Sequence, residues 1–237
     1  MKRIYLTISL VALLATTAFM SANAQQTESG SDSEYIAQPK YKDFRVAIGG
    51  GYARRLGALE KTGDVGLDAI NKKLMNGFNI DADAQYFFKQ TWGLGLNANM
   101  CVTNGSGSGI TINDVGSNLS LKVTQRFTYI GPSFVTRTET NKFLLTGNVG
   151  FGPLFFNEDS SINGVNVVSK KTTVGTNLGL AGEYKVNQKT GVGLKLSYVM
   201  GTIDSVNIEG QNVKYDDDAR YSVSNLMATL FVSFRSW

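Results

Sequence analysis

The stretch that decides the fold is FNIDADAQYFFKQTWGLGLNANMCV, residues 78–102. Apolar and polar side chains alternate with period two on both sides of the short polar segment 89–91. The apolar positions are Phe78, Ile80, Ala82, Ala84, Tyr86 and Phe88, then Trp92, Leu94, Leu96, Ala98, Met100 and Val102. Because successive side chains of a strand point to opposite faces, the pattern predicts two antiparallel strands joined by a tight turn, each with one apolar face.

The same alternation recurs along the rest of the chain and predicts eight strands in all. The other six occupy residues 44–54, 121–135, 143–155, 174–186, 192–200 and 226–235. Short connections at 89–91, 138–141 and 187–190 alternate with long ones at 55–77, 103–119, 157–168 and 201–219. Strict alternation of short and long connections is typical of outer-membrane barrels. The sequence therefore predicts an all-β fold, an eight-stranded antiparallel up-and-down transmembrane β-barrel.

The first long connection contains GLDAINKKLMNG, residues 66–77. Its apolar residues Leu67, Ile70 and Leu74 recur at helical spacing. This spacing predicts a short amphipathic helix in that connection.

Two segments precede the predicted barrel. Residues 1–24 combine a basic start at Lys2 and Arg3, an apolar stretch and the small residues Ala22 and Ala24, as in a secretory signal peptide. Residues 25–42 are polar and without periodicity, which predicts a flexible periplasmic leader. The barrel is predicted to occupy 43–237.

Composition excludes several classes of function. The chain has no histidine, so Ser/His/acid catalysis is ruled out. Of its 23 Lys and Arg, Lys2 and Arg3 lie in the signal peptide, so against 19 Asp and Glu the mature charge is only +2, too weak to favour nucleic acid. The single Cys101 cannot form an intramolecular disulfide. No catalytic, cofactor-binding or metal-ligating residues are predicted.

The face opposite the apolar one carries charges of both signs and is assigned to the barrel interior. In residues 121–135 the apolar set of Leu121, Val123, Phe127, Tyr129 and Val135 is assigned to the lipid side, which turns Arg126 inward. The predicted interior polar network comprises Asp81, Asp83, Arg126, Glu183 and Lys195. Glu183 and Lys195 flank one short turn and are predicted to pair, since unpaired buried charge is costly. Such pairs would plug the barrel.

A soluble eight-stranded barrel of the lipocalin type is the alternative fold, with the apolar faces turned inward. Two features favour the membrane barrel. The polar faces are rich in Gly and Asn rather than Lys and Glu. Eight apolar faces also carry more hydrocarbon than the small interior of an eight-stranded barrel can hold.

Four stretches resemble the outer membrane protein beta-barrel, porin-like superfamily of the Bacteroidetes type. They are KKLMNGFNIDADAQYFFKQTWGLGLNANM (72–100), YIGPSFVTR (129–137), GNVGFGPLFF (147–156) and the terminal NLMATLFVSF (225–234). The resemblance implies a terminal strand that the barrel assembly machinery recognises, with Leu230, Val232, Phe234 and Trp237 as its signal residues. Phe234 is in the apolar register and Trp237 is three residues beyond it, so the strand either bulges near Ser236 or has Phe234 as its anchor.

From the sequence we expect a non-enzymatic surface protein of the bacterial outer membrane, monomeric, with both termini in the periplasm. It would contact outer-membrane lipid, and stabilise the membrane or present loops to an extracellular ligand whose identity the sequence does not give. A narrow passive pore for small polar solutes is the alternative. A lipocalin-like binding protein and a lipid-modifying enzyme are the less favoured readings.

Overall fold

The strand segments close into a ring in the computed structural model, which describes residues 43–57, 64–112, 115–208, 211–214 and 221–236. The elements are β1 (Phe44–Arg55), α2 (Val65–Leu74), β2 (Asn76–Tyr86), β3 (Trp92–Ile112), β4 (Val115–Glu139), β5 (Phe143–Ile162), β6 (Val165–Lys185), β7 (Thr190–Met200), β8 (Thr202–Ile203), β9 (Ser205–Ile208), β10 (Gln211–Lys214), β11 (Tyr221–Ser222) and β12 (Asn225–Ser236). The predicted signal peptide, the leader and Trp237 lie outside the described residues.

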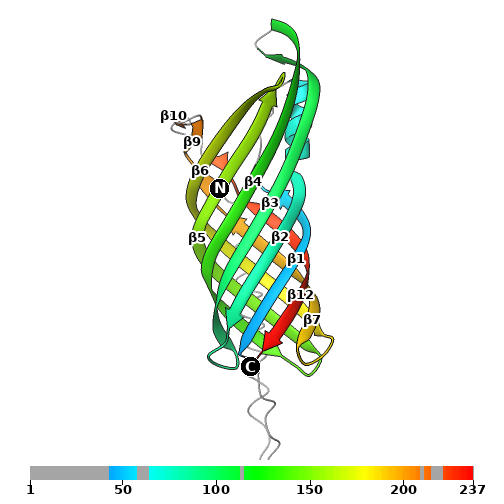
Figure 1. The fold of residues 1–237 in the computed structure, drawn as a ribbon, viewed down its shortest axis with the longest axis vertical. Helices are drawn as coiled ribbons and strands as arrows, with labels where there is room; N and C mark the ends of the chain where they lie inside the picture. The colour runs from blue at the N-terminus through cyan, green and yellow to red at the C-terminus, as the bar shows by residue number, and fades with distance from the viewer. Residues whose placement is uncertain (1–42, 58–63, 113–114, 209–210, 215–220, 237) are drawn as a thin grey trace, which may run out of the picture. The chain divides into compact units, whose positions relative to one another are not determined.

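Eight strands form the ring, each antiparallel to both of its neighbours: β1 to β7 in chain order, followed by β12, which pairs with β7 on one edge and β1 on the other. Figure 1 shows these strands side by side, with β12 returning beside β1. The eight-stranded antiparallel barrel predicted from the sequence is therefore confirmed. β1 and β12 pair without a shift as far as Ser236, so the described part of the last strand has no bulge there.

Alternation separates an apolar outside from a polar inside. Along β12 the even-numbered residues from Leu226 to Phe234 are exposed and the odd-numbered ones are buried. On β7, Leu196 is 57% exposed whereas Ser197 next to it is 1% exposed. An apolar surface turned outward has to be covered by something other than water, which is the pattern of a barrel surrounded by lipid.

The strands run well beyond the predicted boundaries. β3 and β4 continue through residues expected to form a loop at 103–119, and β5 and β6 continue through 157–168. The β5–β6 hairpin turns at Asn163 and Gly164, which have φ angles of 49° and 87°. Asn-Gly is the preferred pair for a two-residue hairpin because both residues need positive φ. Two of the four predicted long loops, 103–119 and 157–168, are thus corrected: most of their residues extend the strands, and the second ends in a tight turn.

The helix expected in the first long connection is confirmed as α2. Asp64 caps it by accepting a hydrogen bond from the Leu67 backbone N–H at 2.9 Å. Ile70 and Leu74 are buried against Ile110 of β3 and Val123 of β4. α2 therefore covers the part of β3 that extends beyond its pairing with β2, which protects that edge. No helix among the described residues is long and apolar enough to cross a membrane.

Candidate functional site

The centre of the barrel holds one lysine between two carboxylates. Lys195 of β7 lies 2.8 and 3.0 Å from the two carboxylate oxygens of Asp81, and 2.8 and 2.7 Å from those of Asp83. All three side chains are almost completely buried. Asp81 and Asp83 are two residues apart on β2, so strand alternation points both of them into the lumen. Lys195 reaches them from the opposite wall.

Two asparagines of β3 hold the carboxylates in place. Asn99 is opposite Asp81 in the strand register, and Asn97 is opposite Asp83. Each amide donates a hydrogen bond to its aspartate. The motifs DAD on β2 and NAN on β3 thus become a ladder of matched donors and acceptors on the inward face, because a hairpin places same-face residues directly across from each other.

A second charged cluster centres on Glu183 of β6. Nε and Nη2 of Arg45 donate to Oε2 of Glu183 at 2.9 and 2.8 Å, and Nη1 of Arg45 donates to Oε1 of Gln85 at 3.1 Å. The Arg235 guanidinium is 3.6 Å from the other carboxylate oxygen of Glu183. Arg45 also lies over the ring of Phe231, 5.2 Å from its centroid. Two arginines thus share one carboxylate.

Glu139 continues this network toward the end of the barrel with the short turns. Its carboxylate pairs with Lys185, and lies 3.8 Å from Arg235 and 3.9 Å from Arg137. Arg137 also donates to the backbone carbonyl of Gln90 at 2.7 Å. The ion pairs therefore extend from mid-barrel to the turns.

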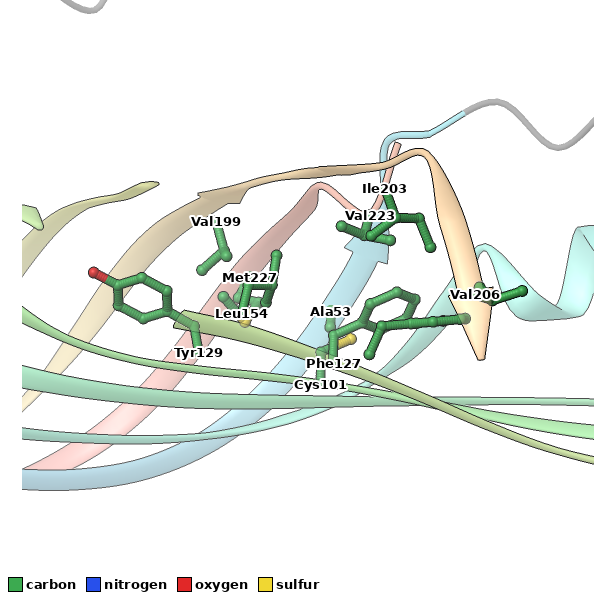
Figure 2. Packing of buried hydrophobic residues seen from close by; sticks show 11 residues of the cluster. Ala53, Cys101, Phe127, Tyr129, Leu154, Val199, Ile203, Val206, Val223 and Met227 are labelled. Carbon is green, nitrogen blue, oxygen red and sulfur yellow. The ribbon is translucent and has the colours of Figure 1, made fainter. Parts of the chain in front are cut away.

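Toward the other end the lumen is filled by apolar side chains. The cluster consists of Ala53, Cys101, Phe127, Tyr129, Leu154, Phe156, Val199, Ile203, Val206, Val223 and Met227. Figure 2 shows these side chains packed against one another between the strands. The hollow beside Cys101, Tyr129 and Met227 measures about 10 Å³. Since even one water needs about that volume, a hydrated ion has no room there.

Arg55 lies on the side of this apolar layer that faces away from the charged clusters. It is fully buried, donates to Gln125 at 2.9 Å and to the Ser222 carbonyl at 3.0 Å, and lies over the ring of Tyr221, 4.3 Å from its centroid. Gln125 in turn donates to Glu158 at 2.7 Å. Among the described residues, charged and polar side chains therefore lie on both sides of the apolar layer.

Arg126 does not belong to the interior network, which corrects the sequence prediction. It is exposed, whereas its neighbours Gln125 and Phe127 are buried. The inward face of β4 is itself apolar in this region. The assumption that apolar residues face the lipid therefore assigned the two faces of β4 the wrong way round. The sequence did contain a signal for the correct assignment. The apolar residues Ile130 and Phe134 lie on the same face of β4 as Arg126, whereas the polar Ser133 lies on the other face.

The predicted pairing of Glu183 with Lys195 is also wrong. In the β6–β7 register Glu183 is opposite Gly193, and Lys195 is opposite Ala181, so the two lie on a diagonal. Each instead pairs across the lumen, Glu183 with Arg45 of β1 and Lys195 with the aspartates of β2. Asp83 does join Lys195, as the sequence indicated.

Sequence reasoning missed Arg45 and Arg55, the two largest fully buried side chains. Both have the parity opposite to Phe44, Val46 and Ile48, so the alternation of β1 already turned them inward. The apolar layer could not be predicted in this way. Alternation shows whether a side chain points into or out of the barrel, but not which side chains it contacts across the lumen. The described residues contain no group of three His, Cys, Asp or Glu placed to hold a metal ion.

Comparison with known proteins supports the fold. No family model matches the sequence, and no curated protein is detectably similar to it. Among solved structures, the outer membrane protein OprG of Pseudomonas aeruginosa is 14% identical, with a TM-score of 0.50 over 82% of this chain and 97% of that one. Neisserial surface protein A is 13% identical, with a TM-score of 0.48 over 81% and 96%. The Escherichia coli outer membrane protease OmpT is 11% identical, with a TM-score of 0.46 over 86% and 100%.

The eight-stranded ring, with its apolar outside and an interior that holds charged clusters and an apolar layer, thus has the fold of small outer-membrane β-barrel proteins. At these identities the likeness concerns the fold alone.

Proposed function

We propose that this chain is a non-enzymatic outer-membrane barrel with a closed lumen, which stabilises the membrane or presents its outer end to an extracellular ligand. The observation that carries the proposal is the filled interior. Lys195, paired with Asp81 and Asp83, would block the middle of the lumen, and the apolar cluster around Phe127 would block the half away from the short turns. Among the described residues these charges pair with one another, which supports a lumen closed to solutes.

Several features support export to the outer membrane. The signal-peptide pattern of residues 1–24 would direct secretion, and the strand ending in Leu230, Val232 and Phe234 presents its apolar side outward for the assembly machinery. Short turns at one end and extended hairpins at the other favour periplasmic termini. Both the monomeric state and the relation to Bacteroidetes-type barrels stay predictions from the sequence.

Labelling of intact cells tests this placement. Asn166→Cys puts a thiol near the exposed tip of the β5–β6 hairpin, and Gln188→Cys puts one in the turn between β6 and β7. We expect a membrane-impermeant maleimide to label Asn166→Cys in whole cells, and Gln188→Cys only after the outer membrane is opened.

The unmodified chain is the control, because its Cys101 is buried and should stay unlabelled in both preparations. Labelling of Gln188→Cys but not Asn166→Cys in whole cells would show the opposite orientation. Recovery of the protein in the soluble periplasmic fraction would contradict membrane insertion.

A further inference from the structure

The outward face of the strands changes from apolar to charged at a defined level. Starting from the short turns, the first charged residue on the outward face is Arg54 on β1, Arg126 on β4 and Lys170 on β6. These three are cations, whereas on β5 the first charged outward residue is Asp159, one row further from the short turns. The three cations directly follow apolar or hydroxyl-bearing positions that include Tyr52, Thr128 and Thr172, so they lie at the margin of the apolar belt.

Arg126 and Lys170 are on the same cross-strand row. The register runs from Arg126 of β4 to Asn157 of β5 and on to Lys170 of β6, with Asn207 of β9 next in line. Adjacent strands are about 4.8 Å apart, so the backbones of the two cations are roughly 10 Å apart across Asn157. Long side chains on such a spacing can reach one anion between them.

A surface hollow of about 540 Å³ adjoins this row. Its lining includes Lys170, Asn157 and Asn207, and, one row nearer the belt, Thr128, Phe155 and Thr172. Thr128, Phe155 and Thr172 are themselves register partners. The hollow thus offers a cation, amides and hydroxyls above an aromatic ring.

The two cations at the site are available. Neither Arg126 nor Lys170 forms an ion pair with another residue in the described ranges, whereas the neighbouring Lys171 is engaged by Asp204 at 3.1 Å and by Ser205. The hydrogen bond from Lys171 lowers the pKa of Asp204, so this carboxylate stays charged and bound to Lys171. The next carboxylate on the outward face of β5, Asp159, lies one row further from the belt, opposite Thr124 and Val168.

We propose that Arg126, Lys170 and the hollow between β4 and β6 bind the phosphorylated headgroup of an outer-leaflet lipid. The phosphate would lie between the two cations with Asn157 beneath it, and Thr128 and Thr172 would donate to its oxygens. The acyl chains would continue along Phe155, Val174 and Ile130, which are on the same outward face. The cationic row lies directly beside the apolar belt. A lipid can contact both of them at once, with its phosphate on the cations and its acyl chains on the belt, whereas a free anion contacts only the cations.

The inference rests on the proposed membrane placement, so the test uses folded protein throughout. Native mass spectrometry in a neutral detergent would measure retention of added diphosphorylated lipid A by the unmodified chain and by Arg126→Gln, Lys170→Gln and the double variant. Each basic residue near an anionic surface contributes about a fivefold change in affinity. We expect each single variant to lose roughly fivefold and the double variant roughly 25-fold.

Lys142→Gln is the matched control, because it removes the same charge from an exposed turn at the other end of the barrel. Folding of each variant is checked by its heat-dependent gel mobility, which separates a failed barrel from a failed site. Equal lipid affinity in the double variant and Lys142→Gln would overturn the inference. Undiminished binding of dephosphorylated lipid, or full displacement by millimolar inorganic phosphate, would overturn it as well.

Discussion

Lys195→Met is expected to lower the free energy of unfolding by about 3–5 kcal/mol, the usual cost of leaving a buried charge without its partner. The ammonium group of Lys195 is within 3.0 Å of oxygens on both Asp81 and Asp83. Without it, the carboxylates of Asp81 and Asp83 lie side by side on the inward face of β2 and keep the hydrogen bonds from Asn97 and Asn99. Urea unfolding in phosphatidylcholine vesicles, followed by tryptophan fluorescence, measures the change.

Removal of the aspartate charges provides the matched test. Lys195→Met combined with Asp81→Asn and Asp83→Asn should regain most of the lost stability, since the remaining groups are neutral and can hydrogen-bond. Lys189→Met, in an exposed turn, should change stability by less than about 0.5 kcal/mol. If Lys195→Met were as mild as Lys189→Met, the central ion cluster would have no part in holding the barrel together.

Glu183→Gln is expected to destabilise the barrel by about 3 kcal/mol, at the lower end of the range for buried pairs. The carboxylate accepts from Arg45 at 2.8 and 2.9 Å and lies 3.6 Å from Arg235. Glutamine keeps the shape and one acceptor oxygen, but leaves two buried guanidinium groups with less negative charge. The same vesicle unfolding experiment measures the change.

A double-mutant cycle shows which residue Glu183 interacts with. Arg45→Gln added to Glu183→Gln should recover part of the loss, because both members of the pair are then neutral. Glu183→Gln and Lys195→Met should be close to additive, since the two residues belong to separate clusters. Strong coupling between Glu183 and Lys195 would contradict the pairing described above.

The ring could be predicted from sequence because a barrel wall has an intrinsic period of two. Leu226 to Phe234 show this pattern clearly, since one side of β12 meets the surroundings and the other meets a polar lumen. The rule that apolar residues face outward failed for β4, because Phe127 and Tyr129 point inward into an apolar layer while Arg126 points outward. Parity identifies the two faces but does not say which one is the interior when both carry apolar residues.

The partners in the ion pairs could not be predicted from the sequence for a related reason. Arg45 and Glu183 are 138 residues apart and lie on strands that are not adjacent in the ring. Their meeting depends on the curvature of the whole barrel and on how far the strands are staggered, and no local pattern encodes either. The β5–β6 hairpin, in contrast, was locally encoded in Asn163-Gly164, and the turn signal was present in the sequence.

Single-channel recording in planar lipid bilayers tests the central claim, a barrel closed by its own side chains. The purified, folded protein would be inserted from detergent in 1 M KCl, with an open porin as the positive control and heat-denatured protein as the negative one. We predict a silent baseline for the unmodified chain, because among the described residues the ion clusters around Lys195 and Glu183 and the apolar layer around Phe127 lie in the lumen, where they would exclude hydrated ions. Steady, stepwise conductance from the unmodified chain would contradict the closed lumen and favour the passive pore.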